Sequence, residues 1–145
     1  MRKWKLQQAM TLVEILVVVS ILAFLTLLTI TFFRNQLFKG NDARRKSDLR
    51  QIQTVVEGYE KDHDCYPDGS LLACDPGTGL SNYINKIPCD LNDTSYYYET
   101  EASACPSWYR VYAKLENEAD PDVTADIGPS GSYNYYAGSP NSPKP

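Results

Sequence analysis

A long uncharged run near the N-terminus constrains this chain more than any other feature. Residues 15–33 are 19 consecutive residues without a charged side chain, and the apolar stretch reaches back to Met10. A helix over the 24 residues 10–33 would extend roughly 36 Å at about 1.5 Å per residue, which is enough to cross the hydrocarbon core of a bilayer. The sequence therefore predicts a transmembrane helix over residues 10–33.

The charges on either side of this run predict its orientation. Arg2, Lys3 and Lys5 precede it with no acidic residue among them, and positive charge holds such a flank in the cytoplasm. Residues 64–145 are then expected outside the cytoplasm, and they carry twelve acidic and four basic side chains, a net charge of −8. This balance argues against a nucleic-acid-binding head, because such domains are normally basic.

The cysteines support an extracytoplasmic head. All four follow the apolar run, at Cys65, Cys74, Cys89 and Cys105. An even number of cysteines in a small domain outside the cytoplasm indicates disulfide bonds. Free thiols or a zinc site are the alternative, although no CxxC pair occurs and the single histidine is His63.

One acidic residue lies inside the apolar run. A carboxylate such as that of Glu14 costs about 2.5 to 3.5 kcal/mol near the centre of a transmembrane helix and less near the interface. Neither a cleaved secretory signal peptide nor an ordinary signal anchor explains it, and the run is too long for the former. A charged residue within a membrane segment is a functional candidate, and a neighbouring cation lowers its cost.

The residues around Glu14, Ala9-Met10-Thr11-Leu12-Val13-Glu14-Ile15-Leu16-Val17-Val18, resemble the prepilin signal of type IV pilins. That pattern is a short basic leader, a small residue, a cleavage point and a hydrophobic helix with glutamate at its fifth position. The resemblance implies that prepilin peptidase cuts between Ala9 and Met10 and methylates the new amino group of Met10. It departs from the pattern at Ala9, where glycine is usual, and at Met10, where phenylalanine is more common.

The resemblance gives Glu14 a role in assembly. In a helical stack of subunits, its carboxylate can meet the Met10 amine of a neighbouring copy. Two costly charges then neutralise each other and set the axial register of the filament.

Beyond the membrane, one continuous helix is predicted from about Thr11 to Asp62. No proline occurs before Pro67, and apolar side chains recur at steps of three and four residues, at Leu49, Ile52, Val56 and Tyr59. On the same helix, Arg44, Arg45 and Lys46 have three interpretations. They are a solvated face, a contact with nucleic acid or anionic lipid, or a contact with the acidic head of another subunit. A solvated face is favoured, since consecutive residues point around the helix axis.

The head is expected to contain a three-stranded antiparallel sheet packed on the helix, an α+β fold. Candidate strands are Ser95–Glu99, Trp108–Leu115 and Tyr133–Tyr136, which are rich in aromatic residues or alternate in polarity. All 11 tyrosines follow residue 58, and we interpret them as sheet packing rather than as a ligand-binding surface. The stretch from Asp42 to Pro67 resembles the major pseudopilin of type II secretion and minimal type IV pilins, whose shape is described as a lollipop.

Two finer expectations concern the head. Nearest-neighbour disulfides, Cys65–Cys74 and Cys89–Cys105, are expected among the three pairings that four cysteines allow, and each short loop would contribute about 2 to 4 kcal/mol. The major pseudopilins hold calcium in a late loop, where this chain has five acidic residues. Solvated acids are the favoured interpretation and a calcium site the alternative, its candidate ligands being Glu116, Glu118, Asp120, Asp122 and Asp126.

The predicted organisation is a cytoplasmic leader (1–9), a transmembrane and filament-core helix (10–33), its amphipathic continuation (34–63), a disulfide-stabilised head (64–136) and a flexible tail (137–145). The expected function is a structural subunit that polymerises after leader cleavage, moving from the inner membrane into an extracytoplasmic or cell-surface filament. Prepilin peptidase, an assembly ATPase and a platform protein are partners implied by the resemblance. No catalytic motif is found, and a monomeric, signal-anchored binding module is the alternative.

Overall fold

The computed structural model describes residues 11–145, and the chain divides into two compact units, residues 1–37 and 38–145. Helix α1 covers Leu12–His63 and contributes to both units. Its observed limits lie one residue from those expected at each end. The long predicted helix is therefore confirmed over the described residues.

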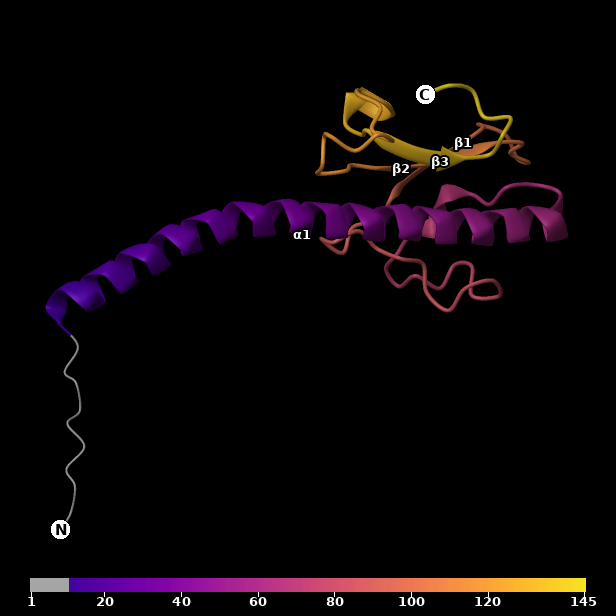
Figure 1. The fold of residues 1–145 in the computed structure, drawn as a ribbon. Coiled ribbons are helices and arrows are strands. Elements are labelled where there is room, and N and C mark those ends of the chain that lie inside the picture. Colours follow the sequence, from indigo (N-terminus) through magenta and orange to yellow (C-terminus); the bar gives the residue numbers. More distant parts are fainter. Residues whose placement is uncertain (1–10) are drawn as a thin grey trace, which may run out of the picture. The chain divides into compact units, whose positions relative to one another are not determined.

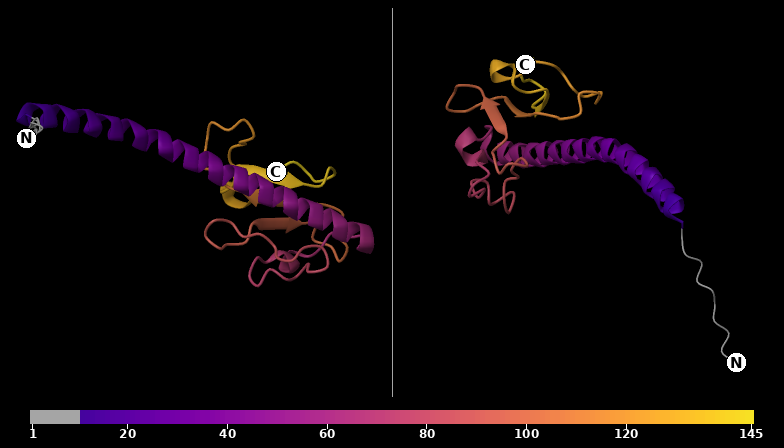
Figure 2. Two further views of the ribbon diagram at one scale, coloured as in Figure 1. Left: turned by 60° about the horizontal axis from the view of Figure 1, so that its bottom comes forward. Right: turned by 90° about the vertical axis from the view of Figure 1, so that its left-hand side faces the viewer.

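The second unit contains an antiparallel sheet of three strands in the order β1-β2-β3 (Figure 1). The strands are β1, Tyr97–Thr100, β2, Tyr109–Ala113, and β3, Tyr135–Gly138, and two short 3-10 turns lie at Gly69–Leu72 and Pro129–Gly131. Each strand overlaps its predicted segment, so the predicted α+β class is confirmed. In two further views the sheet lies alongside the part of α1 that belongs to this unit (Figure 2).

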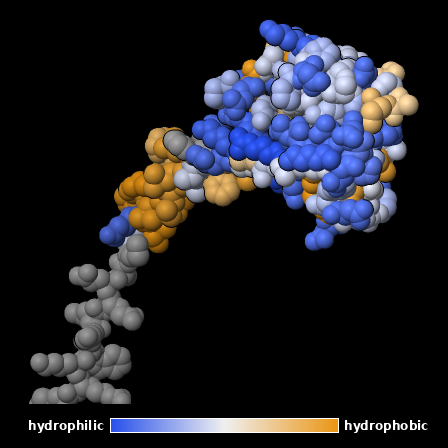
Figure 3. Space-filling model, turned by 90° about the vertical axis from the view of Figure 1, so that its right-hand side faces the viewer, coloured by the Kyte–Doolittle hydropathy of each residue, from blue (hydrophilic) through white to orange (hydrophobic). Residues whose placement is uncertain are grey.

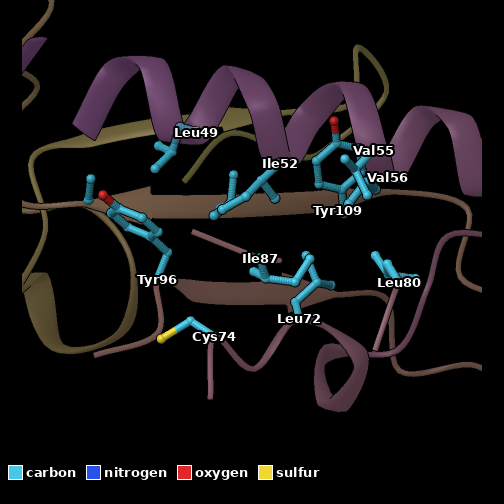
Figure 4. Packing of buried hydrophobic residues seen from close by; sticks show 12 residues of the cluster. Leu49, Ile52, Val55, Val56, Leu72, Cys74, Leu80, Ile87, Tyr96 and Tyr109 are labelled. Atoms are coloured by element: carbon cyan, nitrogen blue, oxygen red, sulfur yellow. The ribbon is translucent and has the colours of Figure 1, made fainter. Parts of the chain in front are cut away.

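The core of the second unit lies between α1 and the inner face of the sheet (Figure 4). Leu49, Ile52 and Val56, all predicted to face the core, are at most 2% exposed. Val55 is also buried, which widens the apolar stripe beyond the predicted spacing. The loop between α1 and β1 closes the remaining side with four apolar or sulfur-containing side chains, those of Leu72, Cys74, Leu80 and Ile87.

The C-terminal segment lies against the sheet. Strand β3 extends to Gly138, two residues into the segment that the sequence assigned to a flexible tail. Beyond it, the backbone N–H of Ser139 donates to the carbonyl of Tyr109 at 3.1 Å, and Ser139 is 3% exposed. Arg110 Nη1 donates to the carbonyl oxygen of Pro143 at 3.1 Å. Residues 139–143 therefore make specific contacts with β2.

All four cysteines form disulfides, but the expected nearest-neighbour pairing is wrong. The bonds join Cys65 to Cys105 and Cys74 to Cys89. The connection between β1 and β2 returns to the end of α1, where the N–H of Tyr66 donates to the carbonyl of Pro106 at 3.0 Å. Chain packing thus brings together two cysteines 40 residues apart, and the small extra entropy of closing a longer loop does not prevent it.

Candidate functional site

The first candidate site lies where α1 begins. The predicted cleavage residues Ala9 and Met10 lie outside the described residues, but Glu14 is in the first turn of α1. Glu14 Oε2 accepts from the backbone N–H of Thr11 at 3.3 Å, and the N–H of Glu14 lies 3.3 Å from Thr11 Oγ1. This is a capping box, in which two side chains satisfy backbone donors that a helix start leaves unpaired.

Within the single chain, Glu14 therefore has a local role that the sequence analysis did not foresee. The spacing Thr-x-x-Glu before an apolar run is the signal that could have revealed it. The same carboxylate is the one that the sequence analysis assigned to assembly. Helix capping and charge pairing with a neighbour are separable, because glutamine can cap a helix but carries no charge.

The apolar part of α1 is exposed along its whole described length. From Leu12 to Ile30 the large apolar side chains are between 46% and 78% exposed. Among the described residues, α1 is the one helix long and apolar enough to cross a membrane, with an 18-residue window of mean hydropathy 2.8. Such a surface needs a lipid or protein environment, and Figure 3 shows the apolar residues gathered along this segment.

Between residues 12 and 30, the three hydroxyl groups are satisfied by the helix itself. Ser20 Oγ donates to the carbonyl of Leu16 at 2.7 Å, and Thr26 Oγ1 donates to that of Ala23 at 2.8 Å. Thr29 Oγ1 donates likewise to Thr26, at 2.9 Å. Because these polar hydrogens are already bonded, the segment can face hydrocarbon without leaving them unpaired.

A second candidate site is the charged face of α1 within the head. Arg45 is buried and contacts three carboxylates, with its Nε 2.8 Å from Asp90 and its Nη1 3.2 Å from Asp42 and 2.9 Å from Glu116. Asp42 is 2% exposed, and its two oxygens accept from the backbone N–H groups of Glu116 and Asn117, each at 2.8 Å. This network joins α1 to two loops of the head. Burial alone would lower the pKa of Arg45, but its hydrogen bonds with Asp90 and Glu116 outweigh burial and raise it.

Next to this network, Lys46 forms two ion pairs with the loop that follows β2. Its Nζ lies 2.6 Å from Asp120 Oδ1 and 2.7 Å from Asp122 Oδ2. The hydrogen bond from Lys46 lowers the pKa of Asp120. The pKa of Lys46 is raised, since these hydrogen bonds outweigh the opposite effect of burial.

These contacts change the interpretation of the basic residues 44–46. Two of the three basic residues, Arg45 and Lys46, bind carboxylates of their own head, while Arg44 remains 57% exposed with Nε 3.8 Å from Asp48. The favoured solvated face is therefore correct for Arg44 alone. An intrachain pairing was not among the interpretations, because sequence spacing does not reveal which loop passes over a helix.

The five calcium candidates do not form a metal site. Asp120 and Asp122 hold Lys46, and Glu116 holds Arg45. Glu118 and Asp126 belong to neither of these ion pairs and line an open cavity of about 360 Å³. Among residues 11–145, no group of three or more histidine, cysteine, aspartate or glutamate side chains is placed to hold a metal ion. The donor set thus does not fit calcium, which needs six to eight oxygens.

Comparison with known proteins adds one finding, and it concerns the N-terminal segment. A family model described as a prokaryotic N-terminal methylation motif matches residues 4–30. No curated protein and no solved structure matches the chain. The matched residues include Ala9, Met10 and Glu14, the residues on which the sequence resemblance rests.

Proposed function

We propose that this chain is a structural subunit of a type IV pilus-like filament and a substrate of prepilin peptidase, since its residues 4–30 match a prokaryotic N-terminal methylation motif. The leader and the apolar helix fit a membrane-anchored precursor that is later extracellular. Cleavage between Ala9 and Met10 and methylation of Met10 produce the mature subunit. An assembly ATPase and a platform protein then move it from the membrane into the filament.

The observation that carries this proposal is the exposed apolar stripe of α1 within the matched segment. In the membrane, lipid covers this stripe, and in a filament the same stripe packs on other copies. Glu14 is the one acidic residue of the matched segment. The N-terminal amine of a neighbouring copy neutralises it and sets the axial register.

Two filament types are candidates. The small head with one three-stranded sheet favours a type II secretion pseudopilus or a minimal type IV pilus. Recovery in a sheared surface fraction favours an extended pilus, and retention at the cell envelope favours a short pseudopilus.

Substitutions at Glu14 test the register role. Glu14→Gln keeps a side chain that can complete the capping box with Thr11 but removes the charge, whereas Glu14→Ala removes both. We expect both variants to insert in the membrane and neither to enter filaments, as measured by immunoblots of membrane and filament fractions. Assembly of the Gln variant at the wild-type level would show that capping matters rather than charge. Normal assembly of both variants would overturn the role of Glu14 altogether.

A further inference from the structure

The outer face of the sheet, which points away from α1, carries two rows of residues in register across the three strands. Tyr97 of β1 lies opposite Tyr112 of β2, which lies opposite Tyr136 of β3. In the next row on the same face, Glu99 lies opposite Arg110, which lies opposite Gly138. We call the first the tyrosine row and the second the polar row.

The tyrosine row is exposed at its two ends and covered at its centre, where the ring of Tyr133 lies 5.8 Å from that of Tyr97 and 5.6 Å from that of Tyr112. Ring centroids are 5.9 Å apart between Tyr97 and Tyr112 and 6.2 Å apart between Tyr112 and Tyr136. Tyr112 is 1% exposed, while Tyr97 and Tyr136 are 39% and 37% exposed. Among residues 39–145, all of which the structure describes, these two are the exposed large apolar side chains. Their position at the two ends of one row places two partly exposed rings on the same face of the sheet.

The polar row offers fixed hydrogen-bonding groups beside the rings. Arg110 is 7% exposed, and its Nη2 lies 3.2 Å from Glu99 Oε2, which also accepts from Tyr112 Oη at 2.7 Å. The Nε of Arg110 is buried without a hydrogen-bond partner, an arrangement that is rare in folded proteins. Gly138 has no side chain above the row, and a Cβ there would lie 3.0 Å from Arg110 Cγ.

A cavity of about 360 Å³ lies at this place, and Glu99, Arg110, Tyr112 and Lys144 are among its lining residues. Its size is in the range of small-molecule sites, which combine apolar walls with a few fixed polar groups. The cavity therefore adjoins the tyrosine row through Tyr112, and Glu99, Arg110 and Lys144 place charged side chains on its wall.

We propose that this outer face binds an uncharged oligosaccharide. The C–H face of a sugar ring is weakly positive and packs on the negative face of an aromatic ring, so Tyr97 and Tyr136 provide stacking surfaces. Sugar hydroxyls both donate and accept, which matches the Arg110–Glu99 pair in the cavity. The carboxylate of Glu99, whose side chain is 32% exposed, can accept from a sugar hydroxyl in the cavity.

Charge selects this ligand class over polyanions. Arg110 and Glu99 neutralise each other, Lys144 adds one positive charge to the cavity wall, and residues 64–145 as a whole carry a net charge of −8. Nucleic acids and acidic polysaccharides would be repelled by the head as a whole. A second copy of the chain is the competing occupant, and the experiment below distinguishes it. The proposal does not depend on filament assembly, because the face belongs to a single head.

The test uses the full chain in lipid nanodiscs, which avoids detergents with sugar head groups. Cellohexaose, maltohexaose and chitohexaose serve as probes in saturation-transfer NMR and titration calorimetry. We expect at least one of these oligosaccharides to bind with a Kd of about 1 mM. Tyr97→Ala and Tyr136→Ala should each weaken that binding roughly fivefold to tenfold, whereas Tyr97→Phe and Tyr136→Phe keep the ring and the affinity.

The possible results distinguish an oligosaccharide from a second copy of the chain as the occupant of this face. Absence of binding by all three probes at about 10 mM would overturn the proposal, as would equal affinity of the alanine and phenylalanine variants. If the alanine variants instead reduce recovery in the filament fraction and no probe binds, a neighbouring copy covers this face. Failure of assembly with sugar binding intact would count against the filament role alone.

Discussion

Arg45 is the side chain whose loss should weaken the head most. It neutralises Asp42, a buried carboxylate that also holds two backbone N–H groups of the late loop. Removing one partner of a buried pair leaves an uncompensated charge, so we expect Arg45→Met to lower the free energy of unfolding by about 3 kcal/mol. Urea unfolding of the full chain, followed by near-ultraviolet circular dichroism, measures this. Arg44→Met is the matched control, since its exposed side chain should contribute less than about 0.5 kcal/mol. Equal stability of the two variants would contradict the role of Arg45.

Lys46 should make the stability of the head depend on pH at both extremes. The pKa of Asp120 is lowered below its usual 3.8, so its contribution is present above that value and is lost as pH falls through the folded-state pKa. The pKa of Lys46 is raised above 10.5, so its contribution is present below that value and is lost as pH rises through the folded-state pKa. We expect Lys46→Met to destabilise the head by about 1 kcal/mol at neutral pH and progressively less as pH falls below 3.8, measured by urea unfolding at each pH. A difference that persists unchanged at low pH would show that Lys46 acts through packing, for example on Tyr135.

At the scale of elements, sequence periodicity predicted the features that depend only on residues close together in the chain. Leu49, Ile52 and Val56 face the core as their spacing indicated, and all three strands lie at aromatic or alternating segments. The pairing of charges and cysteines was not predictable in the same way. It depends on which loop folds over α1 and on where the β1–β2 connection ends, and local spacing contains neither fact. The rows on the outer sheet face likewise require the strand register.

The disulfide pairing can be checked by digestion without reduction. Trypsin cuts after Lys61, Lys86 and Arg110, so Cys65 and Cys74 fall in peptide 62–86, and Cys89 and Cys105 fall in peptide 87–110. The observed bonds join these two peptides, whereas nearest-neighbour bonds would leave them separate. We therefore expect mass spectrometry to find the joined species, which separates into two on reduction. Further cleavage both between Cys65 and Cys74 and between Cys89 and Cys105 should then yield two fragments that each hold one bond and so exclude the Cys65–Cys89 and Cys74–Cys105 pairing. Recovery of separate tryptic peptides would overturn the observed pairing.

Replacing one disulfide at a time should separate their contributions. The Cys65–Cys105 bond spans 40 residues and the Cys74–Cys89 bond spans 15. Loop-closure entropy then predicts contributions of about 4 and about 3 kcal/mol, respectively. Because Cys74 is 1% exposed, its replacement by serine also places a polar group in the core, so we expect removal of the Cys74–Cys89 bond to cost more than the roughly 3 kcal/mol of loop closure alone, and a loss below about 3 kcal/mol would contradict this. Urea unfolding of the two double-serine variants measures both effects.

At the scale of the whole molecule, the proposed filament role depends on processing of the leader. Cleavage after a residue with a small side chain is the step that the motif at residues 4–30 implies, and Ala9 is larger than the usual glycine by one methyl group. We expect the intact mass of the protein from native membranes to start at Met10, with one added methyl group and four hydrogens fewer for two disulfides. Ala9→Gly should be processed at least as fast, whereas Ala9→Leu should accumulate as a precursor that starts at Met1. A wild-type mass that starts at Met1 would mean that alanine blocks cleavage, and the chain would then act as a membrane-anchored module whose outer sheet face remains available for binding.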